Sequence, residues 1–201
     1  MKGLHKMIEK NPEIILASAS PRRQELLKYI VPDFRIIPAD IDETLPEDIS
    51  AEKSAEFLAV KKAKHISEKY PESVVIGSDT VVVIDGEILG KPKDPADAER
   101  MLKKLSRKTH AVITGVCISC GEISESFSCK TSVKFFPLTD EEIREYIATG
   151  EPMDKAGAYG IQGKGCLLAE SVEGDFFNVV GLPASMLKRR LESFLKNENI
   201  L

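Results

Sequence analysis

A segment rich in serine and arginine near the N-terminus carries side chains suited to binding an anion. It reads Ser18-Ala19-Ser20-Pro21-Arg22-Arg23 and follows a short apolar run. Ser20 before Pro21 predicts an N-cap and a first helical turn, where unpaired backbone N–H groups point out of the helix end. Two arginines there face the positive end of the helix dipole, at a cost of up to ~1 kcal/mol. A bound polyphosphate would reverse that cost, and two solvated arginines on a surface helix explain the pattern equally well.

Carboxylates at two places in the chain predict a cation site. Asp40, Asp42 and Glu43 follow one predicted strand, and Asp79 lies inside the valine- and isoleucine-rich stretch 73–84. An acid in an apolar strand is costly to bury unless it meets a cation or hydrogen-bond donors, so Asp79 predicts a metal ion or a basic partner. Gly77 and Thr80 beside it indicate close approach of a ligand. The alternatives are a strand-end aspartate bonded to a turn and, for Asp42 with Glu43, a solvated acidic loop.

Three other features are less specific. Gly90-Lys91-Pro92 places a lysine on a short, proline-stiffened segment, although a lone lysine is usually only surface. The glycine-rich passage from Ala156 to Gly163 lacks the order of a dinucleotide fingerprint or a P-loop, so a structural turn explains it too. Cys117 and Cys120 form a C-x-x-C in a predicted strand, where residues three apart point to opposite faces. Free thiols are therefore predicted in place of a structural zinc site.

Composition limits the class of protein. The chain has 201 residues, 42% hydrophobic and 30% charged, with a formal net charge of -4. This favours one globular domain over residues 1–201, with 1–12 as an N-terminal extension. A protein that wraps duplex nucleic acid needs a broad basic face, so duplex nucleic acid is excluded as the main partner. No stretch is long and apolar enough to span a bilayer, so we expect a soluble, intracellular protein without a membrane partner.

Helices and strands must alternate to position these residues. Asp85-Gly86 is a hairpin signal, and polar residues at 77–80 are expected to interrupt the strand before it. Strands are predicted at 13–17, 34–37, 73–84, 111–119 and 125–136, and near Leu167 and Asn178. Helices are predicted at 21–29, at about 50–69, from Asp94-Pro95, from the capping box Thr139 to Glu142 until Gly150, and from Leu182-Pro183 to Leu195. The pattern predicts a mixed α/β fold.

Ordered motifs run through nearly the whole chain. They are Leu16-Ala17-Ser18-Ala19-Ser20-Pro21-Arg22-Arg23-Gln24-Glu25-Leu26-Leu27, Ile41-Asp42-Glu43, Ser78-Asp79-Thr80-Val81-Val82, Gly90-Lys91-Pro92, Thr114-Gly115-Val116, Lys155-Ala156-Gly157-Ala158-Tyr159-Gly160-Ile161-Gln162-Gly163 and Asn178-Val179-Val180-Gly181-Leu182-Pro183. In this order they resemble the Maf family of nucleoside triphosphate pyrophosphatases, relatives of the enzymes that clear inosine and xanthosine triphosphates. Ser78, where many members carry alanine, and the longer extension before Pro12 are the departures.

The resemblance implies a fold, a metal and a set of roles. The fold would be an elongated mixed sheet with flanking helices and two lobes around a central cleft. A divalent cation, Mg²⁺ or Mn²⁺, a cytoplasmic location and frequent homodimers are also implied. Ser18, Arg22, Arg23, Lys62 and Lys91 would grip the triphosphate of a nucleotide substrate. Glu43 and Asp79 would hold the metal or the attacking water, with Asp79 as proton acceptor or as metal anchor.

Three positions bear on the substrate. Arg22, Thr80 and Gln162 match the family's dTTP/UTP branch and differ in the branch acting on methylated guanosine triphosphate. The Gln162 amide can pair with both the N3–H donor and the O4 acceptor of uracil or thymine. Because an amide can flip to match cytosine, discrimination requires contacts that hold Gln162 in one orientation, and some leakage to CTP is expected.

The resulting hypothesis is hydrolysis of dTTP and UTP, and of modified pyrimidine nucleotides, to the monophosphate and pyrophosphate. Roles in arresting cell division and in keeping modified nucleotides out of nucleic acid would follow. One alternative is a non-catalytic, nucleotide-binding regulator of septum formation, and another is the sister-branch pyrophosphatase for 7-methyl-GTP. Because a sensor does not need activated water, the presence of both an acidic and a basic set favours an enzyme.

Overall fold

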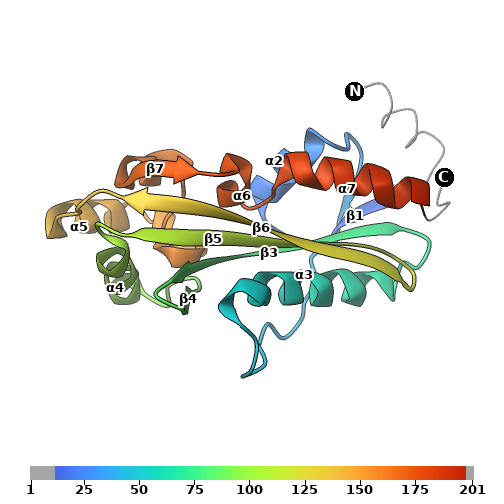
Figure 1. The fold of residues 1–201 in the computed structure, drawn as a ribbon, viewed down its shortest axis with the longest axis horizontal. Helices are drawn as coiled ribbons and strands as arrows, with labels where there is room; N and C mark the ends of the chain where they lie inside the picture. The colour runs from blue at the N-terminus through green and yellow to red at the C-terminus, as the bar shows by residue number, and fades with distance from the viewer. Residues whose placement is uncertain (1–11, 198–201) are drawn as a thin grey trace.

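The protein is built around one long mixed sheet, shown in Figure 1 by a computed structural model that describes residues 12–197. The strands are β1 (Ile14–Leu16), β2 (Arg35–Ile36), β3 (Val74–Ile84), β4 (Glu87–Leu89), β5 (Thr109–Cys120), β6 (Ile123–Phe135) and β7 (Ala169–Glu173). Their order is β2-β1-β3-β5-β6-β7, and β4 also pairs with β3. β1 runs parallel to β2 and β3, and the other pairs are antiparallel. The N-terminal extension predicted for 1–12 lies, up to residue 11, outside the described residues.

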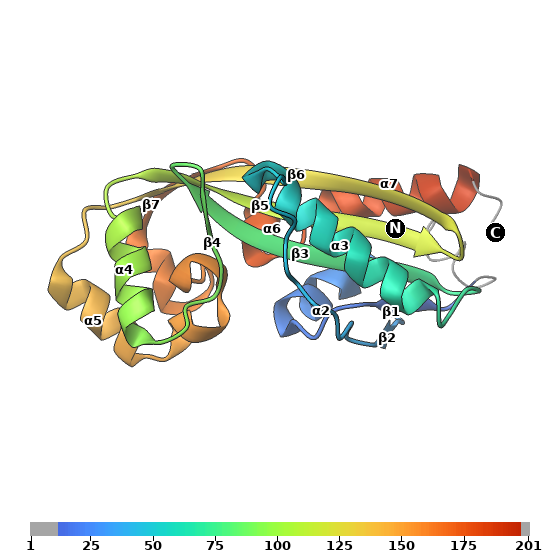
Figure 2. The same ribbon diagram turned by 90° about the horizontal axis from the view of Figure 1, so that it is seen from below.

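Helices flank the sheet on both faces. They are α2 (Pro21–Lys28), α3 (Ala51–Ser67), α4 (Pro95–Leu105), α5 (Asp140–Ala148), α6 (Phe176–Val180) and α7 (Ala184–Asn197), with 3-10 turns η1 (Glu151–Asp154), η2 (Ala156–Ala158) and η3 (Gly163–Leu168). α3 and α7 cover opposite faces of one half, while α4 and α5 lie at the other end of the elongated molecule (Figures 1 and 2). Within residues 12–197, no helix combines the length and apolar character needed to cross a bilayer. The predicted mixed α/β class with two lobes is confirmed.

One face of β3 supports two separate hydrophobic cores. Ile76 packs with α2 and α7 in the first core, and Val82 packs with α4 and α5 in the second. Side chains alternate along a strand, so both point to the same face of β3. Between them on that face lie Ser78 and Thr80. The two polar residues therefore mark where the cores part. Figure 2 shows α4 and α5 at one end of the sheet, with α2 and α7 toward the other.

The opposite face of β3 is covered by α3 at very short range. A Cβ added at Gly77 would lie 2.3 Å from the Ala59 carbonyl oxygen, and one at Gly115 would lie 2.3 Å from the Ala55 carbonyl oxygen. Only glycine lets the helix backbone approach the strands so closely. The prediction that Gly77 admits a ligand is thus replaced by a different role, because Gly77 admits α3.

A gap in strand pairing opens the edge of β3. β1 pairs with β3 up to Ile76, and β4 pairs from Val82 onward, while β5 pairs with the other edge along 75–83. Among the described residues, no strand pairs with 77–81 on the first edge. Asp79 and Thr80 therefore point to opposite faces of a strand whose edge is accessible between the two lobes.

Several local predictions are confirmed by backbone geometry. Asp94 accepts a hydrogen bond from the Asp97 backbone N–H at 2.8 Å at the start of α4, and Thr139 forms a capping box with Glu142. Asp85 and Gly86 both have positive φ, 51° and 77°, as a tight hairpin turn requires.

Two local predictions are wrong. The polar residues 77–80 do not interrupt β3, which continues through them because β5 pairs with the whole stretch. Asn178 lies in helix α6, not in a strand. The Asp175 side chain accepts hydrogen bonds from the Phe177 and Asn178 backbone N–H groups and so caps this short helix, which Gly181 ends with φ 127°. The valines beside Asn178 indicated a strand, and the cap outweighed them.

Candidate active site

A cavity of about 680 Å³ lies at the unpaired edge of β3, between the two lobes. The cavity is lined by all nine residues to which the resemblance gave a role: Ser18, Arg22, Arg23, Glu43, Lys62, Asp79, Thr80, Lys91 and Gln162. Asp40 and Asp42 do not line it, and Asp42 instead accepts hydrogen bonds from Thr44 in an exposed turn. The predicted basic and acidic sets therefore share one cleft.

Two carboxylates in the cleft converge on one lysine, and we call Lys62, Glu43 and Asp79 the acidic site. Lys62 Nζ lies 2.6 Å from Asp79 Oδ1 and 2.7 Å from Glu43 Oε1. The Lys62 and Asp79 side chains are only 10% and 14% exposed, whereas Glu43 is 57% exposed. Burial works to raise the pKa of Glu43, but the hydrogen bond and charge of Lys62 outweigh it and lower this pKa. One positive charge thus faces two negative ones.

The close packing of α3 places Lys62 opposite Asp79. Lys62 comes from the face of α3 that packs on the sheet, next to the buried Ala59 and Ala63. Since Gly77 lets α3 contact β3 directly, the lysine stem reaches the strand edge without exposing its charge to bulk water. The basic partner that the sequence predicted for Asp79 is therefore Lys62.

Arg23 connects three segments of the chain. Its Nε donates to the Gly181 carbonyl at 2.9 Å, Nη1 to Ser18 Oγ at 3.0 Å and Nη2 to Thr80 Oγ1 at 3.0 Å. Burial lowers the pKa of this guanidinium, while the charge of Asp79 works against that change. With five N–H donors, three of them used here, Arg23 fixes the positions of its neighbours and has two donors left.

The hydroxyl of Thr80 belongs to a hydrogen-bond chain whose direction is determined. Thr114 donates to the Asn178 carbonyl at 3.0 Å, so its only proton is used there. In the 2.9 Å contact between the two threonines, Thr80 must therefore be the donor. Thr80 then accepts from Arg23, and only an acceptor lone pair is left facing the cleft. Asn178 in turn donates to the Val112 carbonyl and to Thr131, which anchors α6 to the sheet.

The Ser18 hydroxyl has its donor left over, whereas Thr80 has only an acceptor lone pair left over. Its oxygen accepts from Arg23 Nη1 at 3.0 Å and from the Ser20 backbone N–H at 3.3 Å. Both lone pairs are occupied, so its hydroxyl proton is left for an acceptor in the cleft. The Ser20 side chain makes no capping bond, which leaves the first N–H groups of α2 without a side-chain partner. This corner of the cleft favours an anion.

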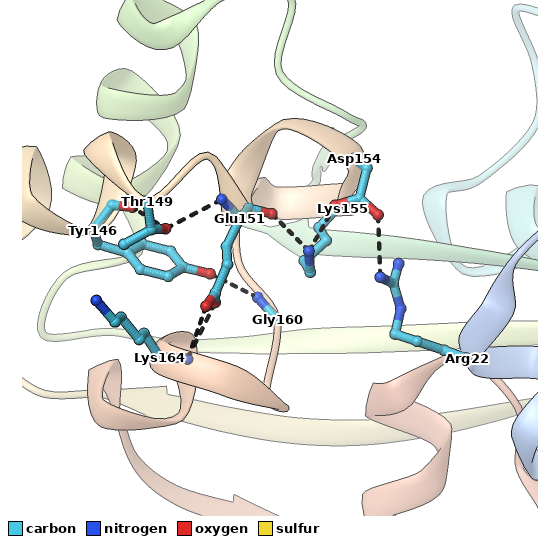
Figure 3. Close-up of polar contacts among 8 residues, drawn as sticks. All are labelled: Arg22, Tyr146, Thr149, Glu151, Asp154, Lys155, Gly160 and Lys164. Atoms are coloured by element: carbon cyan, nitrogen blue, oxygen red, sulfur yellow. Dashed lines mark hydrogen bonds and ion pairs between the residues drawn. The ribbon is translucent and has the colours of Figure 1, made fainter.

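The facing wall adds two residues to which the sequence analysis gave no role: Lys155, the first residue of one motif, and Asp154, the residue before it. We call Arg22, Asp154 and Lys155 the basic site. Asp154 lies between the other two, with Oδ2 3.1 Å from Arg22 Nη1 and Oδ1 2.6 Å from Lys155 Nζ (Figure 3). Asp154 and Lys155 immediately precede the glycine-rich passage, and this position was the one signal available. The pairing with Arg22 could not be found because 132 residues separate Arg22 from Asp154.

Lys91 and Gln162 lie exposed on the cleft wall. Neither makes a side-chain hydrogen bond or ion pair with another residue in 12–197. The charge of Lys91 contributes to the lowered pKa of Glu43, which places its ammonium near the acidic site. No contact within the described residues fixes the Gln162 amide in one orientation.

The cysteines carry no role in this cleft. Cys117, Cys120, Cys129 and Cys166 are all free thiols, and none lines the cavity. Burial raises the pKa of Cys117 to about 12. The prediction of free thiols is confirmed.

Solved structures of similar shape define the class of fold. The Staphylococcus aureus Ham1 protein aligns over 90% of this chain and 98% of its own, with a TM-score of 0.53 and 18% identity. A HAM1 protein from Coxiella burnetii aligns over 92% of this chain and 99% of its own, with a TM-score of 0.51 and 13% identity. At these identities the likeness shows a shared fold, an elongated α/β architecture of the Ham1 type.

Sequence similarity then defines the family, and the chain belongs to the Maf-like protein family, which matches it over residues 13–194. A dTTP/UTP pyrophosphatase of Geobacillus sp. (strain WCH70) is 51% identical over 180 residues, covering 90% of this chain and 97% of that protein. The proteins of that name from Bacillus velezensis and Symbiobacterium thermophilum are 49% and 47% identical, over 96% and 94% of their lengths and 90% of this chain.

Proposed function

We propose that this chain is, as a single domain, a nucleoside triphosphate pyrophosphatase that hydrolyses dTTP and UTP to the monophosphate and pyrophosphate. The observation that carries the proposal is one cleft at the edge of β3 that is lined by both an acidic site and a basic site. Relatives that are 47–51% identical over 90% of the chain carry the name of this activity. A location in the cytoplasm and a homodimeric state, both implied by the resemblance, belong to the same proposal.

A divalent cation, Mg²⁺ or Mn²⁺, would be held by Glu43 and Asp79. The donor set fits such an ion, because both carboxylates converge on one point where Lys62 supplies only a single positive charge. No group of three or more histidine, cysteine or acidic side chains within 12–197 forms a complete cage. Mg²⁺ commonly takes one or two carboxylates and completes its shell with water and substrate phosphates. When bound, the cation would lower the pKa of water and offset phosphate charge.

The remaining residues bind and orient the triphosphate. Ser18 offers a hydroxyl proton, and Arg22 and Lys91 offer cationic donors, all suited to phosphate oxygens. Negative charge grows on the pyrophosphate leaving group as the α–β phosphoanhydride bond breaks, and positioned cations stabilise that charge. Asp79 is the more buried carboxylate of the acidic site, where it can anchor the cation or receive the proton of the attacking water.

The nucleobase is assigned to the part of the cleft wall that carries Gln162. Gln162 presents an amide that matches the N3–H donor and O4 acceptor of uracil or thymine. Thr80, with only a lone pair facing the cleft, suits a donor on the nucleoside and not a phosphate oxygen. Because the Gln162 amide can rotate to match cytosine, we expect measurable hydrolysis of CTP at a lower rate.

The test is a panel of nucleoside triphosphates, including 7-methyl-GTP, with Mg²⁺ or Mn²⁺ and chromatography of the products. The expected result is UMP and pyrophosphate from UTP, and the corresponding products from dTTP. Inorganic phosphate as the sole product would contradict cleavage at the α–β bond. Binding of UTP without any product would instead support the alternative of a regulatory nucleotide-binding protein.

A further inference from the structure

Lys155 lines the cleft, and the proposed function gives it no role. Its side chain is only 15% exposed, and its ammonium donates to the Glu151 carbonyl and to Asp154 Oδ1, both at 2.6 Å. It lines the same cavity as Arg22, from the opposite wall. An ammonium has three N–H donors, so one is left after these two bonds.

The segment around Lys155 is fixed by contacts of its own. The Glu151 carboxylate accepts the Lys164 backbone N–H at 3.1 and 3.2 Å, and the Tyr146 hydroxyl accepts the Gly160 N–H at 3.1 Å (Figure 3). The lysine stem lies directly on Gly160, since a Cβ there would be 2.6 Å from Lys155 Cε. A long, flexible side chain is thus held in one place before any ligand arrives, which reduces the entropy cost of binding.

Asp154 is the exchangeable member of the basic site. Its side chain is 64% exposed, and its two oxygens are shared between Arg22 and Lys155. Burial works to raise the pKa of Asp154, but hydrogen bonds from Lys155 and then Arg22 outweigh it and lower this pKa. Water screens so exposed a carboxylate, so its hold on the two cations is weak.

The charges of the basic site favour a phosphate over the aspartate. Two cations share one carboxylate, which leaves an excess positive charge on this wall. Each phosphate of a triphosphate brings several acceptor oxygens and at least one negative charge, and charge-assisted bonds to such oxygens are strong. A phosphate between Arg22 and Lys155 would replace Asp154 and bring more charge.

We propose that Lys155 is a further substrate-binding residue that contacts the phosphates, and that Asp154 occupies the phosphate position until substrate replaces it. This inference rests on the proposed function and names a part of the same site. The triphosphate would then be gripped from both walls, by Arg22 on α2 and by Lys155 after η1.

Isothermal titration with inorganic tripolyphosphate tests the inference without hydrolysis. Lys155→Met should weaken binding about tenfold or more, because a hydrogen bond to a charged group contributes about 1.5–3 kcal/mol. Asp154→Asn should tighten binding about threefold or more, because the competing negative charge is removed. Lys164→Met is the matched control, since it removes one charge from an exposed side chain outside the cavity, and it should stay within about twofold.

Opposite signs for the two variants distinguish binding from a structural role. Equal weakening by Lys155→Met and Asp154→Asn would overturn the inference, as would wild-type affinity in Lys155→Met or no affinity in the wild type. If Lys155→Met does not fold, Gly160→Ala displaces the lysine stem and should weaken binding in the same way. Tripolyphosphate binding with these signs but without UTP hydrolysis would contradict only the proposed function. UTP hydrolysis with unchanged tripolyphosphate binding in Lys155→Met would contradict only this inference.

Discussion

The acidic and basic sites each contain a lysine–aspartate pair, but carboxylates outnumber cations among the named groups of the first and cations outnumber carboxylates in the second. Each has a lysine ammonium 2.6 Å from an aspartate oxygen. At the acidic site one lysine serves two carboxylates, and at the basic site one carboxylate serves two cations. Among these three groups alone, the first site has an excess of negative charge and the second an excess of positive charge. A lysine–aspartate contact therefore does not reveal the ligand of a site, whereas the third charged group does.

Burial separates the two sites further. Asp79 is 14% exposed and Asp154 is 64% exposed. A buried carboxylate is expensive to leave unpaired, so Asp79 depends on a cation at all times, whether from Lys62 alone or with a metal ion. Asp154 can be solvated when a competitor arrives. The acidic site should therefore be a permanent catalytic feature and the basic site an exchangeable one.

The largest expected contrast is in the rate of UTP hydrolysis when Asp79 or Asp154 is replaced by asparagine. Asp79→Asn should lower the rate of pyrophosphate release from UTP by about a thousandfold, as expected for losing a group that positions or deprotonates water. Asp154→Asn should change the rate at saturating UTP by no more than about threefold, because Asp154 leaves when substrate binds. Steady-state assays of both purified variants measure this. A comparable loss in both would show that the two sites act as one catalytic unit.

Replacing a glycine beside each site by alanine should lower the free energy of unfolding by different amounts. A Cβ at Gly115 would lie 2.3 Å from backbone atoms of Ala55 and Glu56, and backbone atoms cannot move independently. Gly115→Ala should therefore lower the free energy of unfolding by about 3 kcal/mol or more. A Cβ at Gly160 meets mainly the flexible end of Lys155, so Gly160→Ala should cost less than about 1 kcal/mol.

Urea denaturation of both glycine variants gives the two free energies. Gly90→Ala is a useful control, because nothing lies within 4 Å of a Cβ added at Gly90. Equal losses of unfolding free energy in Gly115→Ala and Gly160→Ala would mean that the backbone around the basic site is as rigid as that around the acidic site.

Acid should weaken the lobe that carries the basic site. His110 is 3% exposed in the core of that lobe, bonded to the Tyr159 hydroxyl at 2.7 Å, and burial lowers its pKa from 6.5 to about 4. The unfolded chain binds a proton below pH 6.5 while the folded protein does not. Stability should therefore be complete above this pH and fall by about 3 kcal/mol as the pH drops toward 4.

Replacing the histidine tests this assignment. The His110→Gln variant cannot titrate in this range, so it should lose most of the slope between these two pH values. Urea midpoints of wild type and variant across the range provide the measurement. An unchanged slope in His110→Gln would assign the acid sensitivity to other groups.

The sequence predicted the components of the site better than their connections. Asp79 needed a cation because its strand is apolar, and this local argument correctly predicted a charged partner. That the partner is Lys62 depends on α3 lying against Gly77, a tertiary contact with no local signal. The bond between Arg22 and Asp154 joins two lobes, so periodicity and spacing carry no information about it. Asn178 was assigned to a strand because the adjacent valines favour one, while the helix there depends on the Asp175 cap.

The smallest expected effect is that of Asp154→Asn on stability. The Arg22 and Asp154 side chains are 29% and 64% exposed, and ion pairs this exposed contribute little because water and salt screen them. The free energy of unfolding should change by no more than about 0.5 kcal/mol, and raising the salt concentration should reduce even that difference. Urea denaturation at low and high salt measures both. A loss above about 1 kcal/mol would show that Asp154 holds the two lobes together, in which case a phosphate could not displace it without weakening the fold.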